Sequence, residues 1–385
     1  MNSNTGEAVR DLRMLAGMSQ RDLAKAAGVS RSTVQLLERG EAGELRTDTL
    51  RKLATALSVP TTTLMRGLPA EPGLPAAEDW SGVRAALYRR MKQPAEPPAL
   101  SGVQDAAEAA LPLFAANRYG DLTAVLPALL RDADALGREG RDIRAFLLRM
   151  TGWVLIHRGE TDAADLALRR GLDDADGSEV ASLSRIQCWL LLHTGRFGEA
   201  WDKGIALARD FEPRISTASP AELSAWGWLH LNNSAAAARD ARPGDADDTM
   251  RMAEAAAARI GTEYRPRRDF LRVFGPVTVA IKHAENYMVD DKPDKVLVMA
   301  KRIAPGAGAA TRNNRNRHLL DVATSHARLG QYDAAMDVLD GLRADSPAWL
   351  RRQREARYAM DAIRARRRTL TPRMRDLAEA VSLAL

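Results

Sequence analysis

The chain repeats one kind of turn, and this repetition constrains its fold more than any other feature. Each copy has a small or turn-forming residue, then acidic or polar residues, then an apolar helix that contains alanine. The four clearest copies begin at Asn117, Arg158, Gly195 and Gly330, and two degenerate copies begin at Pro243 and Asp290. Their starts lie roughly 35–50 residues apart, which is the period of repeats made of two helices and a turn. The pattern therefore predicts helix pairs stacked in series from residue 102 to residue 385.

Composition favours an almost entirely helical protein. Of the 385 residues, 45% are hydrophobic but only 5% are aromatic, and Ala, Leu and Arg dominate. These side chains lose little conformational entropy in a helix, and no stretch alternates apolar and polar residues as a half-buried strand does. The chain is also too long for one ordinary core. We therefore expect an all-α protein with more than one domain.

The charge and cysteine content of the chain help to predict its cellular compartment. The net charge of +6 suits a nucleic-acid partner, but 28% charged residues of both signs also make an ordinary surface, so charge alone does not decide. The single cysteine, Cys188, cannot form a disulfide within one chain. The N-terminus has no apolar signal segment, and no window is long and apolar enough to span a bilayer. The sequence predicts a cytoplasmic protein with no membrane contact.

Residues 19–40 predict two short helices joined by a tight turn. Ser19 and Ser30 stand where helix N-caps are needed, and Gly28 stands where the turn needs a left-handed backbone. The inward positions are apolar or small, namely Leu23, Ala24, Ala27, Val29, Val34 and Leu37. The outward positions near the start of the second helix are Arg31, Ser32, Thr33 and Gln35. A helix presented in this way fits the major groove of DNA, where its first turns meet the base edges.

This pattern resembles the Xre and lambda-repressor-type helix-turn-helix family over residues 6–67. The resemblance implies a five-helix DNA-binding domain of a sequence-specific regulator, with double-stranded operator DNA as its partner. It also implies a phosphate contact for Gln20. Along the second helix it implies contacts with bases or adjoining phosphates by Ser30, Arg31, Ser32, Thr33, Gln35 and Arg39. The alternative is a helical hairpin that binds protein instead of DNA.

The charge of this domain is mild for a phosphate binder. Residues 1–67 carry ten basic and seven acidic side chains, a balance of +3. A single copy would bind DNA weakly, and pairing two copies doubles the contacts. We therefore expect a homodimer.

A proline-rich segment separates the two predicted parts. Pro69, Pro72 and Pro75 prevent a helix, a short amphipathic helix follows from Trp80, and a second proline-rich joint covers residues 93–101. The predicted organisation is a DNA-binding domain at 6–67, a linker with one short helix at 68–101, and the helical repeats at 102–385.

The repeats resemble the tetratricopeptide repeat, whose turn carries Gly-x-Tyr-x-x-Ala. Gly195, Phe197 and Ala200 match one copy of this turn, and Gly330, Tyr332 and Ala335 match another. The resemblance implies a tetratricopeptide-like α-solenoid that senses a ligand or mediates dimerisation. Actinobacterial regulators and the peptide-pheromone receptors of Gram-positive bacteria join the same two modules. The implied effector is a small molecule or a peptide.

A ladder of Trp and His side chains follows the repeat. Trp153 and His157 occupy one repeat, Trp189 and His193 the next, and a less certain third copy contains Trp226 and His230. Residues at i and i+4 share a helix face, so the ladder predicts an apolar groove with hydrogen-bonding nitrogens. We include Trp228, in the third copy, among the expected ligand contacts. The alternative is that these rings pack the repeats together.

A second region expected to contact ligand is the helix that begins at Pro276. Thr278, Lys282 and Glu285 lie near one of its faces. This segment, and the one from His318, resemble the actinobacterial regulators mentioned above. The alternative is a helix N-terminus whose polar residues face water.

The sequence contains no motif of a known catalytic or cofactor site. No zinc-protease motif, phosphate loop, nucleophile elbow or dinucleotide fingerprint is present, and the His residues have no Cys or carboxylate at metal-ligand spacing. We expect no enzyme activity, no cofactor and no metal. The leading hypothesis is a ligand-responsive transcriptional regulator. The alternative is a regulator or scaffold whose repeat domain binds a protein partner, with no small ligand.

Overall fold

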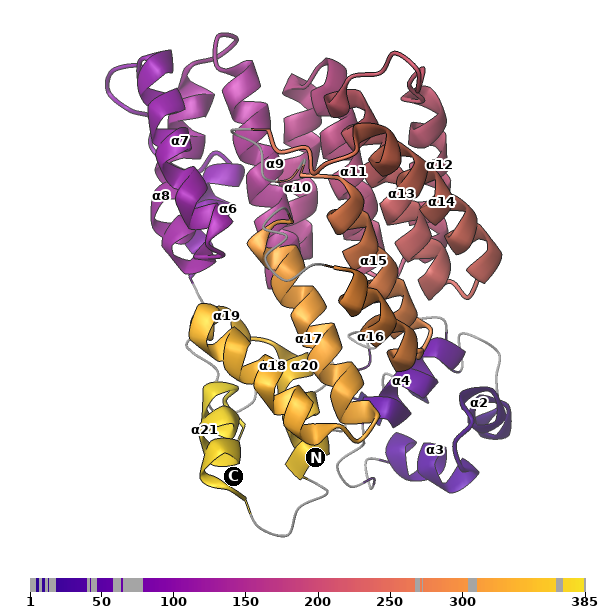
Figure 1. Cartoon of the computed structure of the whole chain (residues 1–385). Coiled ribbons are helices and arrows are strands. Elements are labelled where there is room, and N and C mark those ends of the chain that lie inside the picture. The colour runs from indigo at the N-terminus through magenta and orange to yellow at the C-terminus, as the bar shows by residue number, and fades with distance from the viewer. Residues whose placement is uncertain are drawn as a thin grey trace. The chain divides into compact units, whose positions relative to one another are not determined.

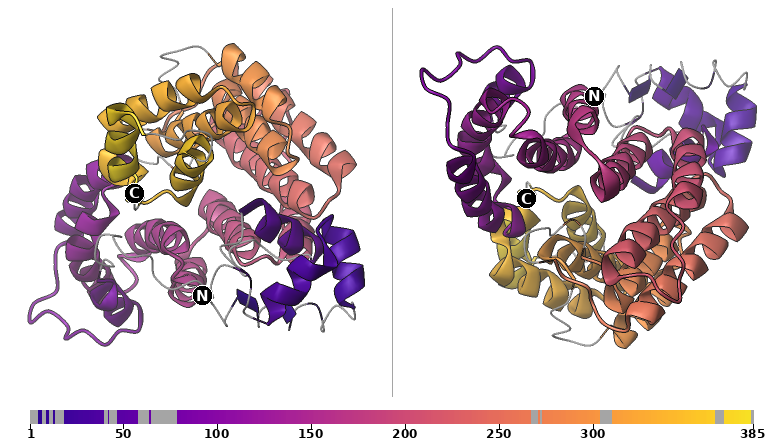
Figure 2. Two further views of the ribbon diagram at one scale, coloured as in Figure 1. Left: turned by 90° about the horizontal axis from the view of Figure 1, so that it is seen from below. Right: turned by 90° about the horizontal axis from the view of Figure 1, so that it is seen from above.

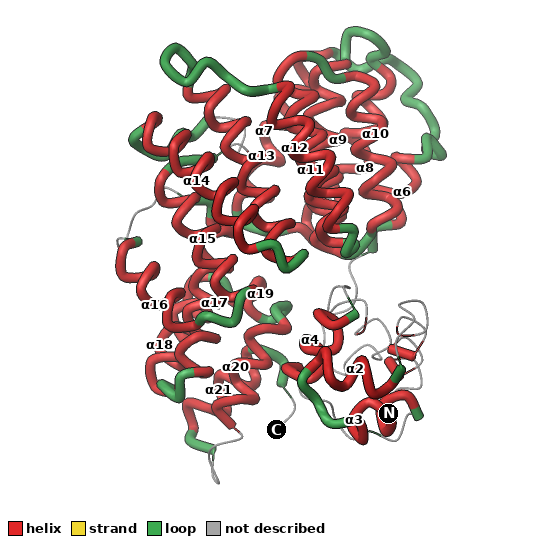
Figure 3. The backbone as a smooth tube through the Cα atoms, turned by 90° about the vertical axis from the view of Figure 1, so that its right-hand side faces the viewer, coloured by secondary structure: helices red, strands yellow, loops and turns green. Residues whose placement is uncertain are grey.

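A computed structural model of the chain contains two compact units (Figure 1). One comprises Met1–Pro75 and Leu191–Phe197, and the other comprises Ala76–Leu190 and Gly198–Leu385. The structure describes residues 5, 6, 9, 10, 13, 19–39, 42, 47–57, 64, 79–266, 271, 273–303, 310–364 and 370–383. Within these ranges the regular structure is helical, apart from one bridge between Tyr264 and Phe274 (Figure 3). The expected all-α class is confirmed.

The first unit is built around three short helices, α2 (Gln20–Ala27), α3 (Arg31–Glu38) and α4 (Thr47–Ala56). Helix α2 packs against both of the others. The contact is apolar, because Leu23, Val34, Leu37, Leu50 and Leu53 are all buried. Much of the remainder of the predicted five-helix domain lies outside the described residues.

The helices of the second part of the chain follow one another with short connections. They are α6 (Ser81–Leu87), α7 (Leu100–Ala115), α8 (Tyr119–Ala135), α9 (Arg141–Arg158), α10 (Thr161–Asp174), α11 (Gly177–His193), α12 (Phe197–Asp210), α13 (Pro220–Arg239), α14 (Pro243–Ile260), α15 (Pro276–Val289), α16 (Pro293–Arg302), α17 (Arg312–Arg328), α18 (Tyr332–Asp345), α19 (Pro347–Leu350), α20 (Arg354–Arg364) and α21 (Pro372–Ala380). Their order in space follows their order in the chain, as both views in Figure 2 show.

All six turns found in the sequence have the same backbone geometry. In each, one residue takes the left-handed conformation, with φ between 56° and 80°: Asn117, Gly159, Gly195, Ala241, Asp291 and Gly330. The N–H of the next residue then donates to the carbonyl five residues before it, over 2.8–3.0 Å in every copy. This hydrogen bond satisfies a carbonyl at the end of the first helix and reverses the chain. The shared geometry produces the pairs α7–α8, α9–α10, α11–α12, α13–α14, α15–α16 and α17–α18.

Successive pairs pack through their first helices. Helix α7 contacts α9, α13 contacts α15, α15 contacts α17, and α17 contacts α20. Small residues permit close approach within and between pairs. A Cβ added to Gly152 would meet the Leu168 side chain at 2.7 Å, and one added to Gly227 would meet the Phe274 ring at 2.1 Å. The first helices thus pack in series from α7 to α9 and from α13 to α17.

The short helix expected in the linker is part of the second unit's core. Trp80, Val83 and Leu87 of α6 are buried in the same apolar cluster as the helices from α7 to α11. Helix α6 packs on α8, and Arg170 of α10 donates to the carbonyl of Leu87 at 2.7 Å. The stretch from Trp80 to Leu87 therefore does not act as a linker.

The last helix covers the end of the helical region. Thr371 caps α21 by accepting a hydrogen bond from the backbone N–H of Met374, and Pro372 takes the first helical position. Met374, Leu377 and Val381 are buried in a cluster with residues of α17, α18 and α20. An open end of stacked helices needs such a cover. Among the described helices, none combines the length and apolar character that crossing a membrane requires.

The turn geometry predicts opposite effects for two exposed glycines. Gly330→Ala is expected to lower the free energy of unfolding by about 1–2 kcal/mol, because Gly330 has φ +75° and a Cβ is strained there. Gly341→Ala, inside α18, is expected to raise it by up to about 1 kcal/mol through helix propensity. A Cβ at either position has open space around it, so only the backbone conformation differs. Urea unfolding of both variants checks this, and equal effects would contradict it.

Candidate nucleic-acid interface and a cavity in the helical region

The turn between α2 and α3 is fixed by local hydrogen bonds. Ser19 accepts from the backbone N–H of Asp22, and the Asp22 carboxylate accepts from the Ser19 backbone N–H at 3.1 Å, which is a reciprocal capping box. Gly28 ends α2 with φ 60°, a conformation that a Cβ penalises. Ser30 then caps α3 by accepting from the N–H of Thr33 at 3.0 Å. These contacts hold the two helices in a defined relative orientation.

One buried carboxylate ties α3 to the residues before it. Glu38, whose side chain is 4% exposed, accepts from Arg13 Nε at 2.6 Å and from a terminal nitrogen of Arg13 at 2.9 Å. It also accepts from Gln20 Nε2 at 2.8 Å. Burial alone would raise the pKa of Glu38, but the hydrogen bonds from Arg13 and Gln20 outweigh it and lower that pKa. The predicted phosphate contact of Gln20 is thus limited to the amide N–H that Glu38 does not use.

The surface of α3 divides as the sequence pattern predicts. Val34 and Leu37 are buried, while Arg31, Ser32 and Arg39 are exposed. Thr33 and Gln35 are half-buried beside them. The exposed cations among the described residues of Met1–Pro75 are Arg10, Arg21, Lys25, Arg31, Arg39 and Lys52. The start of α3 therefore offers polar side chains next to positive charge, as major-groove recognition requires.

In the second unit, aromatic rings form a continuous row across α7, α8, α9 and α11. Phe114 and Tyr119 each lie against Trp153, with ring centroids 5.2 Å and 5.8 Å away. The Trp153 and His157 ring centroids lie 4.0 Å apart with their planes tilted by 52°, and His157 lies 6.4 Å from Trp189. Three of the four ladder residues on α9 and α11, Trp153, His157 and Trp189, therefore belong to one contiguous aromatic surface.

A cavity of about 380 Å³ opens on this aromatic row. Its walls come from the aromatic row, the α14–α15 connection, α13, α15 and the start of α17. The lining residues are Phe114, Ala115, Asn117, Tyr119, Trp153, His157, Arg185, Trp189, Trp228, Asn232, Arg265, Pro266, Leu271, Val273, Lys282, Ala310, Thr311, Arg312, Asn313 and Asn314. Its volume lies within the range of small-molecule sites, near the lower end.

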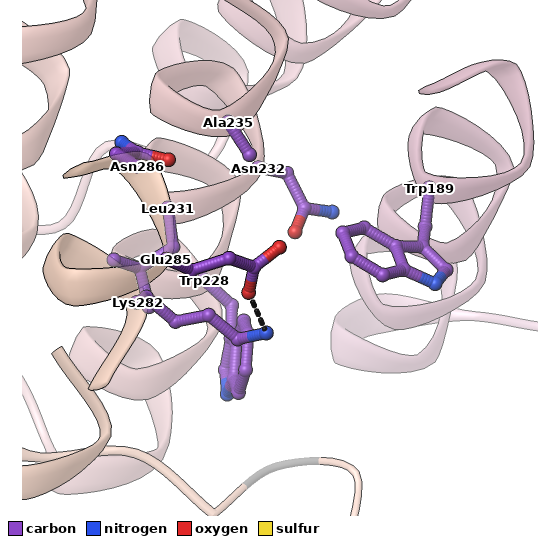
Figure 4. A pocket seen from close by; sticks show the side chains of 8 residues that line it. All are labelled: Trp189, Trp228, Leu231, Asn232, Ala235, Lys282, Glu285 and Asn286. Atoms are coloured by element: carbon purple, nitrogen blue, oxygen red, sulfur yellow. Dashed lines mark hydrogen bonds and ion pairs between the residues drawn. The ribbon is translucent and has the colours of Figure 1, made fainter. Parts of the chain in front are cut away.

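Five of the eight residues singled out for ligand contact line this cavity, namely Trp153, His157, Trp189, Trp228 and Lys282. Glu285 lies beside it, in a small adjoining pocket that shares Trp189, Trp228 and Lys282 (Figure 4). The other two, His193 and Thr278, do not line it.

The expected ligand contacts that do not line the cavity lie on the surface or are buried in the packing. His193 is exposed on α11. Thr278 is fully buried and donates to Glu263 Oε2 at 2.7 Å. The other carboxylate oxygen of Glu263 accepts from the backbone N–H groups of Val277 and Thr278, so this pair caps α15. Trp226 and His230, the uncertain third copy of the ladder, are buried in the packing of α13.

An ion-pair group borders the cavity at α15. Lys282 donates to Glu285 at 2.8 Å, and Arg239 of α13 donates to the other oxygen of the same carboxylate at 2.9 Å. Burial acts to raise the pKa of Glu285, but Lys282 and Arg239 lower it far below its usual range. Figure 4 shows Lys282 reaching toward Glu285 and Asn232 pointing toward Trp189. Glu285 thus holds Lys282 at the edge of the cavity.

Several lining residues were not predicted from the sequence. Phe114 and Tyr119 flank the first turn and were not among the residues expected to contact a ligand. Arg185, Asn232 and Arg265 belong to no motif and reach the cavity only through packing. Arg185 and Asn232 could have been predicted from their helical spacing. Arg185 precedes Trp189 by one turn of α11, and Asn232 follows Trp228 by one turn of α13.

Possible metal ligands and the single thiol were compared across the described residues. No group of three or more His, Cys, Asp or Glu side chains placed to hold a metal ion occurs among them. Burial raises the pKa of the Cys188 thiol to about 11, which keeps it protonated at neutral pH.

The comparisons with known proteins concern the first unit. The sequence model of the helix-turn-helix family matches residues 9–64. Neither the curated proteins nor the solved structures give a match. The chain therefore carries an Xre-type helix-turn-helix DNA-binding domain at its N-terminus, followed by a large all-helical region.

Glu38 makes the first unit sensitive to acid. Because folding lowers its pKa, its stabilising contribution is complete above the ordinary Glu value of about 4.3 and is lost as pH falls through the lowered value. Glu38→Gln should lower the free energy of unfolding of the first unit by about 1–3 kcal/mol at pH 7 and remove this part of its acid dependence. The loss of stability is measured by amide-exchange protection factors of α2 and α3 between pH 7 and pH 3. Glu96→Gln, at an exposed position, is the control. If the stability of Glu38→Gln falls with pH in parallel with that of the wild type, Glu38 is not the source of the acid sensitivity.

Proposed function

We propose that this protein is a sequence-specific, DNA-binding transcriptional regulator whose helical region senses an effector. The observation that carries the proposal is the surface of α3, with Arg31, Ser32 and Arg39 exposed beside Thr33 and Gln35. Caps at Ser19 and Ser30 and the Glu38 ion pair fix that helix before DNA arrives. Pre-ordering of this kind lowers the entropy cost of binding. A protein that binds an operator acts where the DNA is, which places it in the cytoplasm.

Arg31 and Gln35 are proposed to read bases, because Arg pairs with guanine and Gln with adenine through two parallel hydrogen bonds. Ser32 and Thr33 are proposed to contact bases or phosphates, and Arg39 a phosphate. Ser30 contributes chiefly as the cap of α3, since its hydroxyl accepts from Thr33. The local charge of +3 is small, so we propose that two copies bind together as a homodimer.

The second unit is proposed to be a tetratricopeptide-like α-solenoid and the sensor. Six turns with one geometry and the stacking of first helices support a repeat architecture. The cavity lies on the surface of those first helices, so an occupant touches several pairs at once. Binding there would favour one relative arrangement of the pairs over others, and that change would alter the geometry of a dimer on DNA.

DNA binding is tested with fragments that flank the protein's own gene and with selection from a random duplex library. We expect salt-sensitive binding, weakened by about 1–3 kcal/mol in Arg31→Ala or Gln35→Ala. Arg209→Ala changes an exposed cation of α12 and is the matched control. If neither the fragments nor the library gives salt-sensitive binding, the regulator proposal fails.

Sensing is tested by thermal shift of the full chain with a fractionated cell extract. A low-molecular-weight fraction should raise the midpoint temperature of thermal unfolding, and Trp153→Ala or Trp189→Ala should abolish this rise. Trp201→Ala, outside the lining, controls for the loss of an indole. A shift given only by a macromolecular fraction would instead favour a repeat domain that binds a protein partner.

A further inference from the structure

We infer that the cavity binds a small organic anion that carries an aromatic ring system. This inference rests on the proposed sensor role of the second unit, and it names the chemistry of the effector. Four properties of the cavity lead to it: the sign of its charge, the helix end in its wall, its aromatic surface and an unpaired amide.

Among the described residues that line the cavity, the charged side chains are all basic. Arg185, Arg265, Lys282 and Arg312 belong to this set, and none of its twenty members is Asp or Glu. This bias stands out in a chain with 50 acidic and 56 basic side chains. Glu285 neutralises part of the charge on Lys282, and Asp345 lies 3.6 Å from Arg312. Cations in a concave, partly apolar wall attract an anion more strongly than they would in open water.

The first turn of α17 adds to the positive field. Thr311, Arg312, Asn313 and Asn314 all line the cavity, and Thr311 is the N-cap of this 17-residue helix. Helix N-termini carry partial positive charge and favour anions. The first turn of α17 contains no acidic residue. The carboxylate that many helices place there to offset the dipole is therefore not present.

Part of the lining is aromatic, and two of its rings lie against cations. Phe114, Tyr119, Trp153, Trp189 and Trp228 contribute rings to the lining. The Arg185 guanidinium lies 5.0 Å from the Trp228 ring, and Lys282 Nζ lies 5.5 Å from the Trp189 ring. Rings of this kind accept a flat apolar group by stacking. A ligand with an aromatic part and an acidic part would contact both the rings and the cations.

Asn117, which lines the cavity, has an unpaired donor. Its Oδ1 accepts from the Tyr119 hydroxyl at 2.7 Å. Its Nδ2 is buried in the cavity wall and has no hydrogen-bond partner among the described residues. A buried donor without an acceptor costs free energy, so an acceptor oxygen on the ligand would satisfy it. The volume of about 380 Å³ suits one molecule of two or three rings.

A matched pair of fluorescent probes tests this chemistry on the full chain. 8-Anilinonaphthalene-1-sulfonate and N-phenyl-1-naphthylamine share one ring system and differ in the sulfonate. We expect the sulfonate to bind with one-to-one saturation and about tenfold more tightly than the neutral probe. Added salt should weaken the anionic probe only.

Variants locate the site. Arg265 and Arg312 are exposed, so replacing both with Gln leaves the core intact. The double variant should weaken the sulfonate about tenfold and the neutral probe less than twofold. Trp189→Leu should weaken both probes. Arg209→Gln, on α12, should weaken neither.

The inference is overturned if the two probes bind equally, if the double variant leaves sulfonate binding unchanged, or if neither probe saturates. DNA binding measured on the same preparations separates this result from the function itself. If the protein binds operator DNA but the two probes bind equally, the anion inference fails and the regulator proposal stands. If the probes bind with charge selectivity but no DNA binds, the regulator proposal fails and the anion inference stands.

Discussion

The helical region that follows residue 79 depends on one backbone hydrogen bond made six times. At each turn a left-handed residue lets the next N–H reach the carbonyl five residues earlier, and the chain reverses within a few residues. Because the geometry is constant, each helix pair presents its first helix to the same side. Five turns use Gly, Asn or Asp, which tolerate this conformation, whereas Ala241 adopts it at a cost. That copy therefore relies on packing, such as the extensive contact between α13 and α14.

The cavity follows from that repetition. Trp153 and Trp189 lie in different pairs, yet the equivalent placement of α9 and α11 brings them to one surface. The irregular connection between α14 and α15 completes the wall, because Glu263 caps α15 and Phe274 is buried beneath Gly227. Regular helices thus supply the rings, and one irregular segment supplies part of the rim.

The sequence predicted features that depend on local spacing. The caps at Ser19 and Ser30, the turn at Gly28 and the buried face of α3 all follow from neighbours a few residues apart. Six helix turns were recognisable for the same reason. The sequence did not predict contacts between distant segments. Thr278, expected at a ligand, donates to Glu263, fifteen residues away in sequence, and Gln20, expected at a phosphate, donates to Glu38 on the next helix. No local pattern reveals whether a polar side chain has found a partner inside the protein.

Three of the seven tryptophans, Trp153, Trp189 and Trp228, line the same cavity. Indole emission depends on the polarity around the ring and on nearby groups that quench it. A molecule that displaces water from this cavity would therefore change the intrinsic fluorescence of the protein, with no label attached. The arrangement makes the chain its own optical reporter of occupancy, and single Trp→Phe changes would divide that signal among α9, α11 and α13.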